Sequence, residues 1–413
     1  MSAVAAASTD PQRRISALIA ILAAAFNLRI GIVAIGPIVD DIRADTGMSS
    51  AVAGVLTTIP LLCMGVFAFF GPVLVRRLGE GRVILISLGL IILGTLVRSS
   101  VPSALFVLLM TLPIGLGIAL IGVTLPAVVK QKFPDRGGVV TGAYVASLSS
   151  GVVIVGLGLV PLSHALGGWR PALAVTAVPA VGAALLWLIA GGMGSTRPGE
   201  MDDAVPVQGL PGRSGLGWTI PLLLAVTFGL QSMCFAGMIS WAPSLFEDAG
   251  WTQGQAALVT SSIGGFTVIA SLTVPAWSEG RDRRSWASVS AFVMALGVLG
   301  VGVAPTHLPW VWLTMFGLGT GAVFALLLTL PLDMTDDHHR VAELSAWMLG
   351  IGYLLSGTSP VLTGALRDLT GSFTVPMVLL SGLGITSGVL AHGLPRRVQY
   401  APPRSGAAPQ ESL

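Results

Sequence analysis

The chain has 413 residues, of which 53% are hydrophobic and only 10% are charged, and its mean hydropathy is +0.85. Soluble domains carry about 25% charged residues, so this composition excludes an ordinary soluble protein and indicates one that crosses a bilayer many times. The pI of about 9.2 does not indicate a nucleic-acid partner, because the basic residues lie in short loops between apolar segments.

Twelve apolar segments are long enough to cross a bilayer as helices. A polar interruption from Gly194 to Gly215 follows the sixth segment. We therefore predict an all-α membrane protein with twelve transmembrane helices in two six-helix pseudo-symmetric halves. Its parts are a tail (1–14), a first half (15–193), a linker (194–216), a second half (217–394) and a second tail (395–413). The predicted spans are 15–38, 51–75, 82–99, 103–129, 138–163, 170–193, 217–241, 254–277, 286–304, 308–332, 342–366 and 374–394.

Arg29 is the most informative residue, because it lies inside the first span. The apolar run from Ile15 to Pro37 has 23 residues, which is about 34 Å as a helix. An arginine at that depth costs at least ~2.5–3.5 kcal/mol and keeps its proton. Such a charge normally faces the protein interior or a water-filled cavity and has a partner.

No acidic residue is found in the middle of a predicted span, so Arg29 has no evident carboxylate partner at its depth. A planar guanidinium suits two-pronged binding of a carboxylate or a similar flat anion. We therefore expect Arg29 to bind a solute. The alternative is that Arg29 hydrogen-bonds backbone carbonyls and polar side chains between helices.

Four further polar residues inside spans are candidate solute contacts. Asn27 lies two positions before Arg29, about 200° around an ideal helix, so both reach one cavity only if the first span is distorted. Gln231 in the seventh span is the counterpart of the polar site in the first. Tyr144 and Tyr353 each carry a hydroxyl that needs a partner. The alternatives are a polar contact between helices for Asn27 and packing or an interfacial position for the tyrosines.

Arg98 closes the third span beside two serines, and we expect it to extend to the outer membrane interface rather than to take part in function.

Lysine and arginine are distributed unequally between the two sides of the predicted membrane. Seventeen of the 22 lie in tails and loops on the side of the termini, three lie in loops on the other side and two lie within spans. Basic residues favour cytoplasmic loops, so we predict that both termini are cytoplasmic. We expect the protein in the cell inner membrane.

The two halves share a short pattern, Gly115-Leu-Gly117 before Thr124-Leu-Pro126 and Gly317-Leu-Gly319 before Thr329-Leu-Pro331. Further short motifs are AFNLR at 25–29, GP at 36–37, LTTIP at 56–60, QS at 231–232, WAP at 241–243 and GYL at 352–354. By these motifs, over residues 15 to 394, the chain resembles the major facilitator superfamily, and within it the group of cyanate permeases and 2-nitroimidazole transporters.

The resemblance implies a secondary transporter of a small polar or anionic solute, with its site between the halves near the membrane midplane. The alternative is an efflux carrier for neutral or cationic drugs, but a cation exporter would favour a buried acid and the spans show none. We expect no enzymatic activity, cofactor or metal, because no nucleotide loop, metal-ligand spacing or nucleophile arrangement occurs. The expected partners are the lipid bilayer and a solute, and we expect a monomer.

Overall fold

The computed structural model describes residues 11–101, 103–133, 137–191, 218–335 and 338–396. It contains twelve helical segments that are long and apolar enough to cross a membrane. The helices are α2 (Pro11–Val33), η1 (Gly36–Ile38), α3 (Val39–Thr46), α4 (Ser50–Leu78), α5 (Glu80–Ser100), α6 (Ala104–Lys132), α7 (Gly137–Ala165), α8 (Trp169–Val175), α9 (Val178–Ile189), α10 (Thr219–Asp248), α11 (Gln253–Trp277), α12 (Arg283–Val303), α13 (Pro309–Met334), α14 (His338–Thr370) and α15 (Thr374–Gly393).

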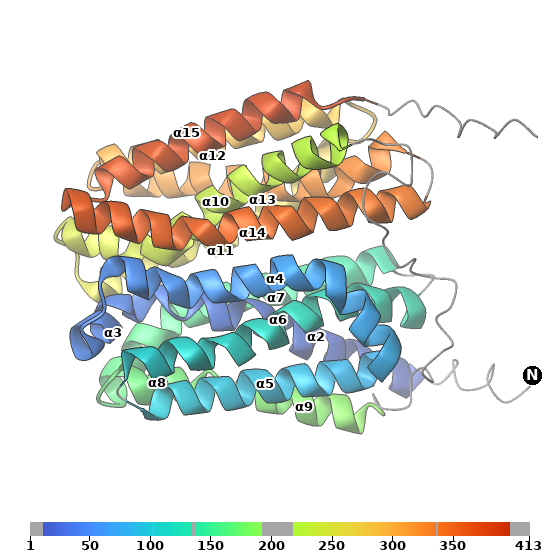
Figure 1. Ribbon diagram of the computed structural model, residues 1–413, viewed down its shortest axis with the longest axis horizontal. Helices are drawn as coiled ribbons and strands as arrows, with labels where there is room; N and C mark the ends of the chain where they lie inside the picture. Colours follow the sequence, from blue (N-terminus) through green and yellow to red (C-terminus); the bar gives the residue numbers. More distant parts are fainter. Residues whose placement is uncertain (1–10, 102, 134–136, 192–217, 336–337, 397–413) are drawn as a thin grey trace, which may run out of the picture.

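The helices form two bundles that follow the order of the sequence. Figure 1 shows α2 to α9, in blue to green, on one side and α10 to α15, in yellow-green to red, on the other. The first and last predicted tails and the predicted linker (194–216) lie almost entirely outside the described residues.

The most extensive contacts between the halves are made by two helix pairs: α4 packs against α14, and α7 packs against α11 (Figure 1). Glycines allow these helices to approach closely. A Cβ atom on Gly54 of α4 would lie 2.5 Å from the Pro360 carbonyl oxygen of α14, and one on Gly65 would lie 2.8 Å from the Gly350 oxygen. Small residues at helix contacts are the usual way for membrane helices to pack.

Hydroxyl groups add hydrogen bonds to this interface. Thr58 Oγ1 of α4 donates to the Gly357 carbonyl oxygen of α14 at 2.6 Å, and Ser240 Oγ of α10 donates to Thr57 Oγ1 at 2.9 Å. Each such bond contributes about 0.5–1.5 kcal/mol net. The halves are therefore joined by both close packing and polar contacts.

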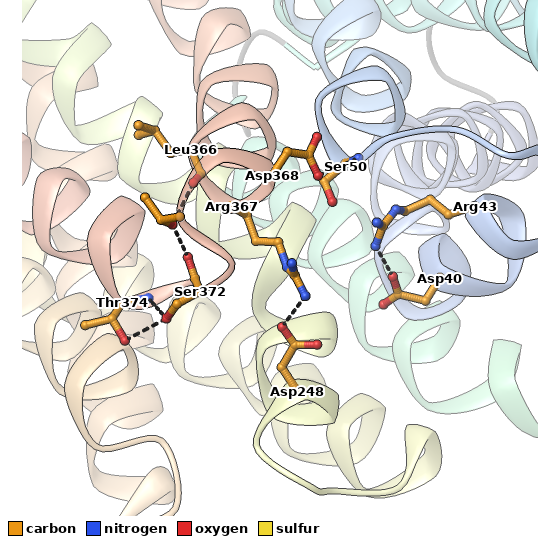
Figure 2. A network of polar contacts seen from close by, with 10 residues as sticks. Asp40, Arg43, Ser50, Asp248, Leu366, Arg367, Asp368, Ser372 and Thr374 are labelled. Carbon is orange, nitrogen blue, oxygen red and sulfur yellow. Dashed lines mark hydrogen bonds and ion pairs between the residues drawn. The ribbon is translucent and has the colours of Figure 1, made fainter.

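The end of the bundle that carries α3 is closed by polar contacts between the halves. Asp368 of α14 accepts hydrogen bonds from the backbone N–H groups of Ser50 (3.2 Å) and Ala51 (2.9 Å), at the start of α4. Gln253 Nε2 of α11 donates to Asp41 Oδ2 (2.8 Å) and to the Pro37 carbonyl oxygen (3.2 Å). Figure 2 shows Asp368 beside Ser50. A carboxylate at a helix N-terminus satisfies free N–H groups and interacts favourably with the helix dipole.

Two predicted spans are interrupted in the structure. The first, expected over 15–38, ends as α2 at Val33 and continues through η1 and α3 to Thr46. Pro37 in η1 explains the break, because proline lacks an N–H group and disfavours a helix before it. The sixth span, expected over 170–193, consists of α8 and α9, with a proline in the first turn of α9.

The expected position of Arg98 is wrong. Its side chain is 0% exposed, and Nε, Nη1 and Nη2 have no hydrogen-bond partner among the residues that the structure describes. The reason is tertiary: α5 packs against α6, α8 and α9, and Arg98 lies on the covered face of α5.

Asp282, between α11 and α12, makes several hydrogen bonds at the opposite end of the second half. Its carboxylate accepts hydrogen bonds from Arg284 Nε (2.9 Å) and Nη2 (2.7 Å), and it caps α12 by accepting from the Arg284 backbone N–H group. Arg284 in turn donates through Nη1 to the Leu394 carbonyl oxygen just after α15. The side-chain hydrogen bond from Arg284, followed by the backbone bond and the charges of Arg284 and Arg396, lowers the pKa of Asp282 to about 2.

Replacement of Asp282 should lower the stability of the second half to a modest degree. Asp282→Asn keeps a helix-capping oxygen but loses the charge, whereas Asp282→Ala loses both, at a cost of about 0.5–2 kcal/mol. A lowered pKa makes the charged carboxylate stabilising above its unfolded value of 3.8, and this contribution is lost only as the pH falls through about 2. Melting curves of the wild type and Asp282→Asn should therefore differ by the same amount at pH 5 and pH 8. A difference that disappears at pH 5 would contradict this assignment.

Candidate functional site

A cavity lies between the two halves and is lined by both. The first half contributes side chains from α2, α4 and α7, and the second contributes side chains from α10, α11, α13 and α14. The space between these side chains is about 650 Å³ when the solvent that it opens to is included. Its apolar wall comprises Leu61, Leu148, Val152, Phe235, Ile239, Ile263, Gly264 and Phe324, and its polar lining comprises Arg29, Ser149, Gln231, Ser232, Thr267, Thr320, Tyr353 and Ser356.

Arg29 projects from α2 to this cavity and is partly exposed. Its guanidinium carbon lies 4.9 Å from the ring centroid of Phe235, which belongs to α10 of the other half. Within the described chain, Arg29 makes no hydrogen bond and no ion pair. A cation over an aromatic face is attracted by about 0.5–2 kcal/mol, but the ring leaves the N–H groups at the edge of the guanidinium without acceptors.

Gln231 reaches the cavity from α10 and is 1% exposed. Its Nε2 donates to Ser232 Oγ at 2.6 Å, while its Oε1 has no partner among the described residues. Tyr353 of α14 lies on the same wall, with its ring edge-to-face against Phe228 at a centroid distance of 5.4 Å. The structure thus brings three of the five predicted site residues, Arg29, Gln231 and Tyr353, to one cavity.

Asn27 and Tyr144 are not among the residues that line the cavity. Asn27 is 1% exposed, and its Nδ2 donates to the Ala23 carbonyl oxygen one turn earlier in α2 at 2.8 Å. Because α2 is continuous to Val33, Asn27 and Arg29 point to different sides of the helix. Tyr144 of α7 packs at the edge of the hydrophobic core of the first half.

The cavity is also lined by residues that were not predicted from the sequence. Phe235 follows Gln231 by four positions, so both lie on the same face of α10; this spacing could have indicated it. Thr320 and Phe324 have the same spacing on α13, but nothing in the sequence relates their face to that of α10.

The charge of the cavity lining comes from a single residue among those described. Arg29 is its one charged residue among the side chains that the structure places there, and no aspartate or glutamate accompanies it. A cation in an apolar cavity attracts an anion strongly because water screens it poorly there. The arrangement therefore suits a small anion or a solute with a negative end.

The model of the Major Facilitator Superfamily matches residues 18–342. This chain belongs to the Major Facilitator Superfamily. The predicted fold of twelve membrane helices in two halves is thereby confirmed, as is the expectation of a multi-pass transporter rather than an enzyme.

Two relatives in the superfamily are similar to the chain over most of its length. A 2-nitroimidazole transporter of Escherichia coli (strain K12) is 30% identical over 93% of this chain and 95% of its own. The cyanate transport protein CynX of the same organism is 30% identical over 86% of this chain and 91% of its own. The predicted resemblance to this group is confirmed.

A solved structure supports the fold. The crystal structure of a D-xylose–proton symporter superimposes with a TM-score of 0.72 over 92% of this chain and 98% of that chain, at 15% sequence identity. At this identity the likeness concerns the superfamily fold alone.

Proposed function

We propose that this superfamily member is a secondary transporter that moves a small polar or anionic solute across the cytoplasmic membrane by alternating access, with Arg29 as the anion contact. The observation that carries the proposal is the guanidinium of Arg29 in the cavity between the halves, without an acidic partner in the described residues. Relatives named for cyanate and 2-nitroimidazole transport support a small solute with polar or anionic character.

A bound anion would supply the hydrogen-bond acceptors that the described residues do not provide for Arg29. The N–H groups at the edge of a guanidinium match the two oxygens of a carboxylate or a similar flat anion, and also those of a neutral nitro group. Phe235 covers one face of the guanidinium, so the solute would approach the edge. Because Arg29 and Phe235 belong to different halves, a solute at this position would contact the interface that alternating access opens and closes.

A thermal-shift screen of the purified protein tests the proposal. A ligand that binds the folded state raises its stability by RT ln(1 + [L]/Kd), about 2.7 kcal/mol at a hundredfold excess over Kd. Cyanate, nitrate, acetate and benzoate are suitable monoanions, with chloride at equal ionic strength as the control. We expect at least one organic monoanion to raise the melting temperature. Stabilisation by cationic dyes alone would instead favour a drug efflux carrier.

We also propose an orientation in the membrane, with both termini in the cytoplasm and α3 on the outer side. The excess of lysine and arginine in the tails and in the loops on the same side supports it. A cysteine at position 247, at the end of α10 that lies near α3, should react with a membrane-impermeant maleimide added to intact cells. The native Cys63 and Cys234 are buried, so they give little background. Labelling only in inverted vesicles would reverse the orientation.

A further inference from the structure

Two fully buried polar atoms on the cavity wall have no hydrogen-bond partner among the described residues. Gln231 Oε1 and Thr320 Oγ1 both have no hydrogen-bond partner in the described part of the chain, and their residues are 1% and 3% exposed. Leaving a buried polar atom unsatisfied is costly. Such atoms in a cavity indicate a ligand that satisfies them.

Thr320 departs from the usual behaviour of threonine in this protein. Thr111, Thr124 and Thr260 each donate to the carbonyl oxygen four residues earlier in their helix, at 2.6–2.8 Å. Mid-helix threonines commonly make this bond. Thr320 of α13 does not make it, and its hydroxyl remains free on the cavity wall.

Three neighbouring polar groups already have hydrogen-bond partners in the protein. Ser356 Oγ donates to the Ser232 carbonyl oxygen at 2.9 Å, and Thr267 Oγ1 donates to the Gly317 carbonyl oxygen at 3.3 Å. Ser232 Oγ accepts the amide of Gln231. Among the described residues, the cavity therefore presents one cation, Arg29, a buried acceptor without a partner, Gln231 Oε1, and the unpaired hydroxyls of Thr320, Tyr353 and Ser149.

We propose that the solute is an organic monoanion that carries a separate hydrogen-bond donor on a flat apolar body. Its anionic group lies against the edge of Arg29, its donor bonds to Gln231 Oε1 with the Thr320 hydroxyl beside it, and its body contacts Phe235 and Phe324. This inference rests on the proposed function and narrows its substrate class. A single positive charge matches a single negative one, and an amide oxygen accepts but cannot donate. The rings of Phe235 and Phe324 in the lining offer a contact surface for a flat apolar body.

Rigid ligands that differ only in the donor test this class. The probes are benzoate, 3-hydroxybenzoate, 4-hydroxybenzoate and 4-methoxybenzoate, measured by calorimetric titration on the purified full-length protein. A methoxy group accepts hydrogen bonds but does not donate them. We expect one hydroxybenzoate to bind about tenfold more tightly than benzoate and the methoxy analogue, because a site with a buried unpaired acceptor rejects an analogue that lacks the donor.

The variants Gln231→Leu and Thr320→Val remove the two polar groups and keep a similar shape. Each should reduce the preference for the hydroxylated ligand toward a ratio of one. Thr386→Val is the matched control, because Thr386 is exposed on α15 and its hydroxyl bonds to its own helix at Gly382; it should keep the wild-type ratio.

The outcomes separate this inference from the proposed function. Three outcomes would overturn the donor requirement. The wild type could bind benzoate and both hydroxybenzoates equally, it could bind neither hydroxybenzoate, or the affinity ratio could be unchanged in both variants. If Arg29→Gln weakens all of these ligands while no preference for a donor exists, the anion contact stands and only the inference fails. If Arg29→Gln binds every probe as well as the wild type does, the anion contact itself fails.

Discussion

Arg29→Gln should lower the affinity for an anionic solute by about 10- to 150-fold, the equivalent of one charge-assisted hydrogen-bond contact of roughly 1.5–3 kcal/mol. The fold should survive, because removal of Arg29 leaves no buried acid unpaired: the described residues provide no ion pair for it. Arg29→Lys should give an intermediate affinity, since lysine keeps the charge and loses the two-pronged geometry. Calorimetric titration and melting curves on the same preparations measure both properties.

Arg43→Gln is the matched control for this prediction. Arg43 pairs with Asp40 at 2.7 Å on α3, outside the cavity (Figure 2), and both side chains are partly exposed. Such pairs contribute about 0–1 kcal/mol, so affinity and melting temperature should change little. If Arg29 instead has a structural role, Arg29→Gln and Arg29→Lys would both fold poorly, and any folded protein would bind the anion normally. Normal affinity in well-folded Arg29→Gln would refute the anion contact.

Gly54→Ala should shift the protein away from the conformation seen here. The new Cβ would lie 2.5 Å from the Pro360 carbonyl oxygen and 2.9 Å from the Val361 nitrogen, and backbone atoms cannot give way as a side chain can. Overpacking costs about 1–3 kcal/mol, which changes the ratio of two conformations by about 5- to 150-fold. We expect transport to fall at least tenfold and the α3 end of the α4–α14 interface to separate. Spin labels at the exposed positions 44 and 369 should report a longer distance.

Gly89→Ala provides the control for Gly54→Ala. Gly89 lies in α5, and a Cβ there meets no heavy atom within 4 Å. Alanine also favours a helix over glycine by about 1 kcal/mol, so this variant should transport normally and melt at the same or a higher temperature. Equal behaviour of the two alanine variants would show that the close approach of α4 and α14 is not needed for transport.

Part of the candidate site was predictable from the sequence because charge and burial are local properties. A charge such as Arg29 within an apolar run must face a cavity or a partner, however its helix packs. Gln231 occupies the corresponding polar position in the first span of the second half. Asn27 shows what the sequence could not settle. It lies two residues from Arg29, and this spacing excludes a shared face only because α2 is a regular helix as far as Val33. The same is true of Arg98, since its burial follows from the helices that pack on α5.

Four properties follow from the amino-acid sequence alone: the class of the protein, the number of membrane helices, their division into two halves and the need to accommodate one charge inside the first span. Hydrophobic length, loop charge and the cost of a buried cation depend only on neighbouring residues and on the bilayer. Three features depend on how the helices pack: Phe235 covers Arg29, Thr320 and Gln231 have polar atoms in the cavity lining without partners in the described chain, and Asp368 closes one end against α4. These contacts join residues from different helices and different halves, and their geometry depends on how the helices rotate and approach, which no single segment specifies.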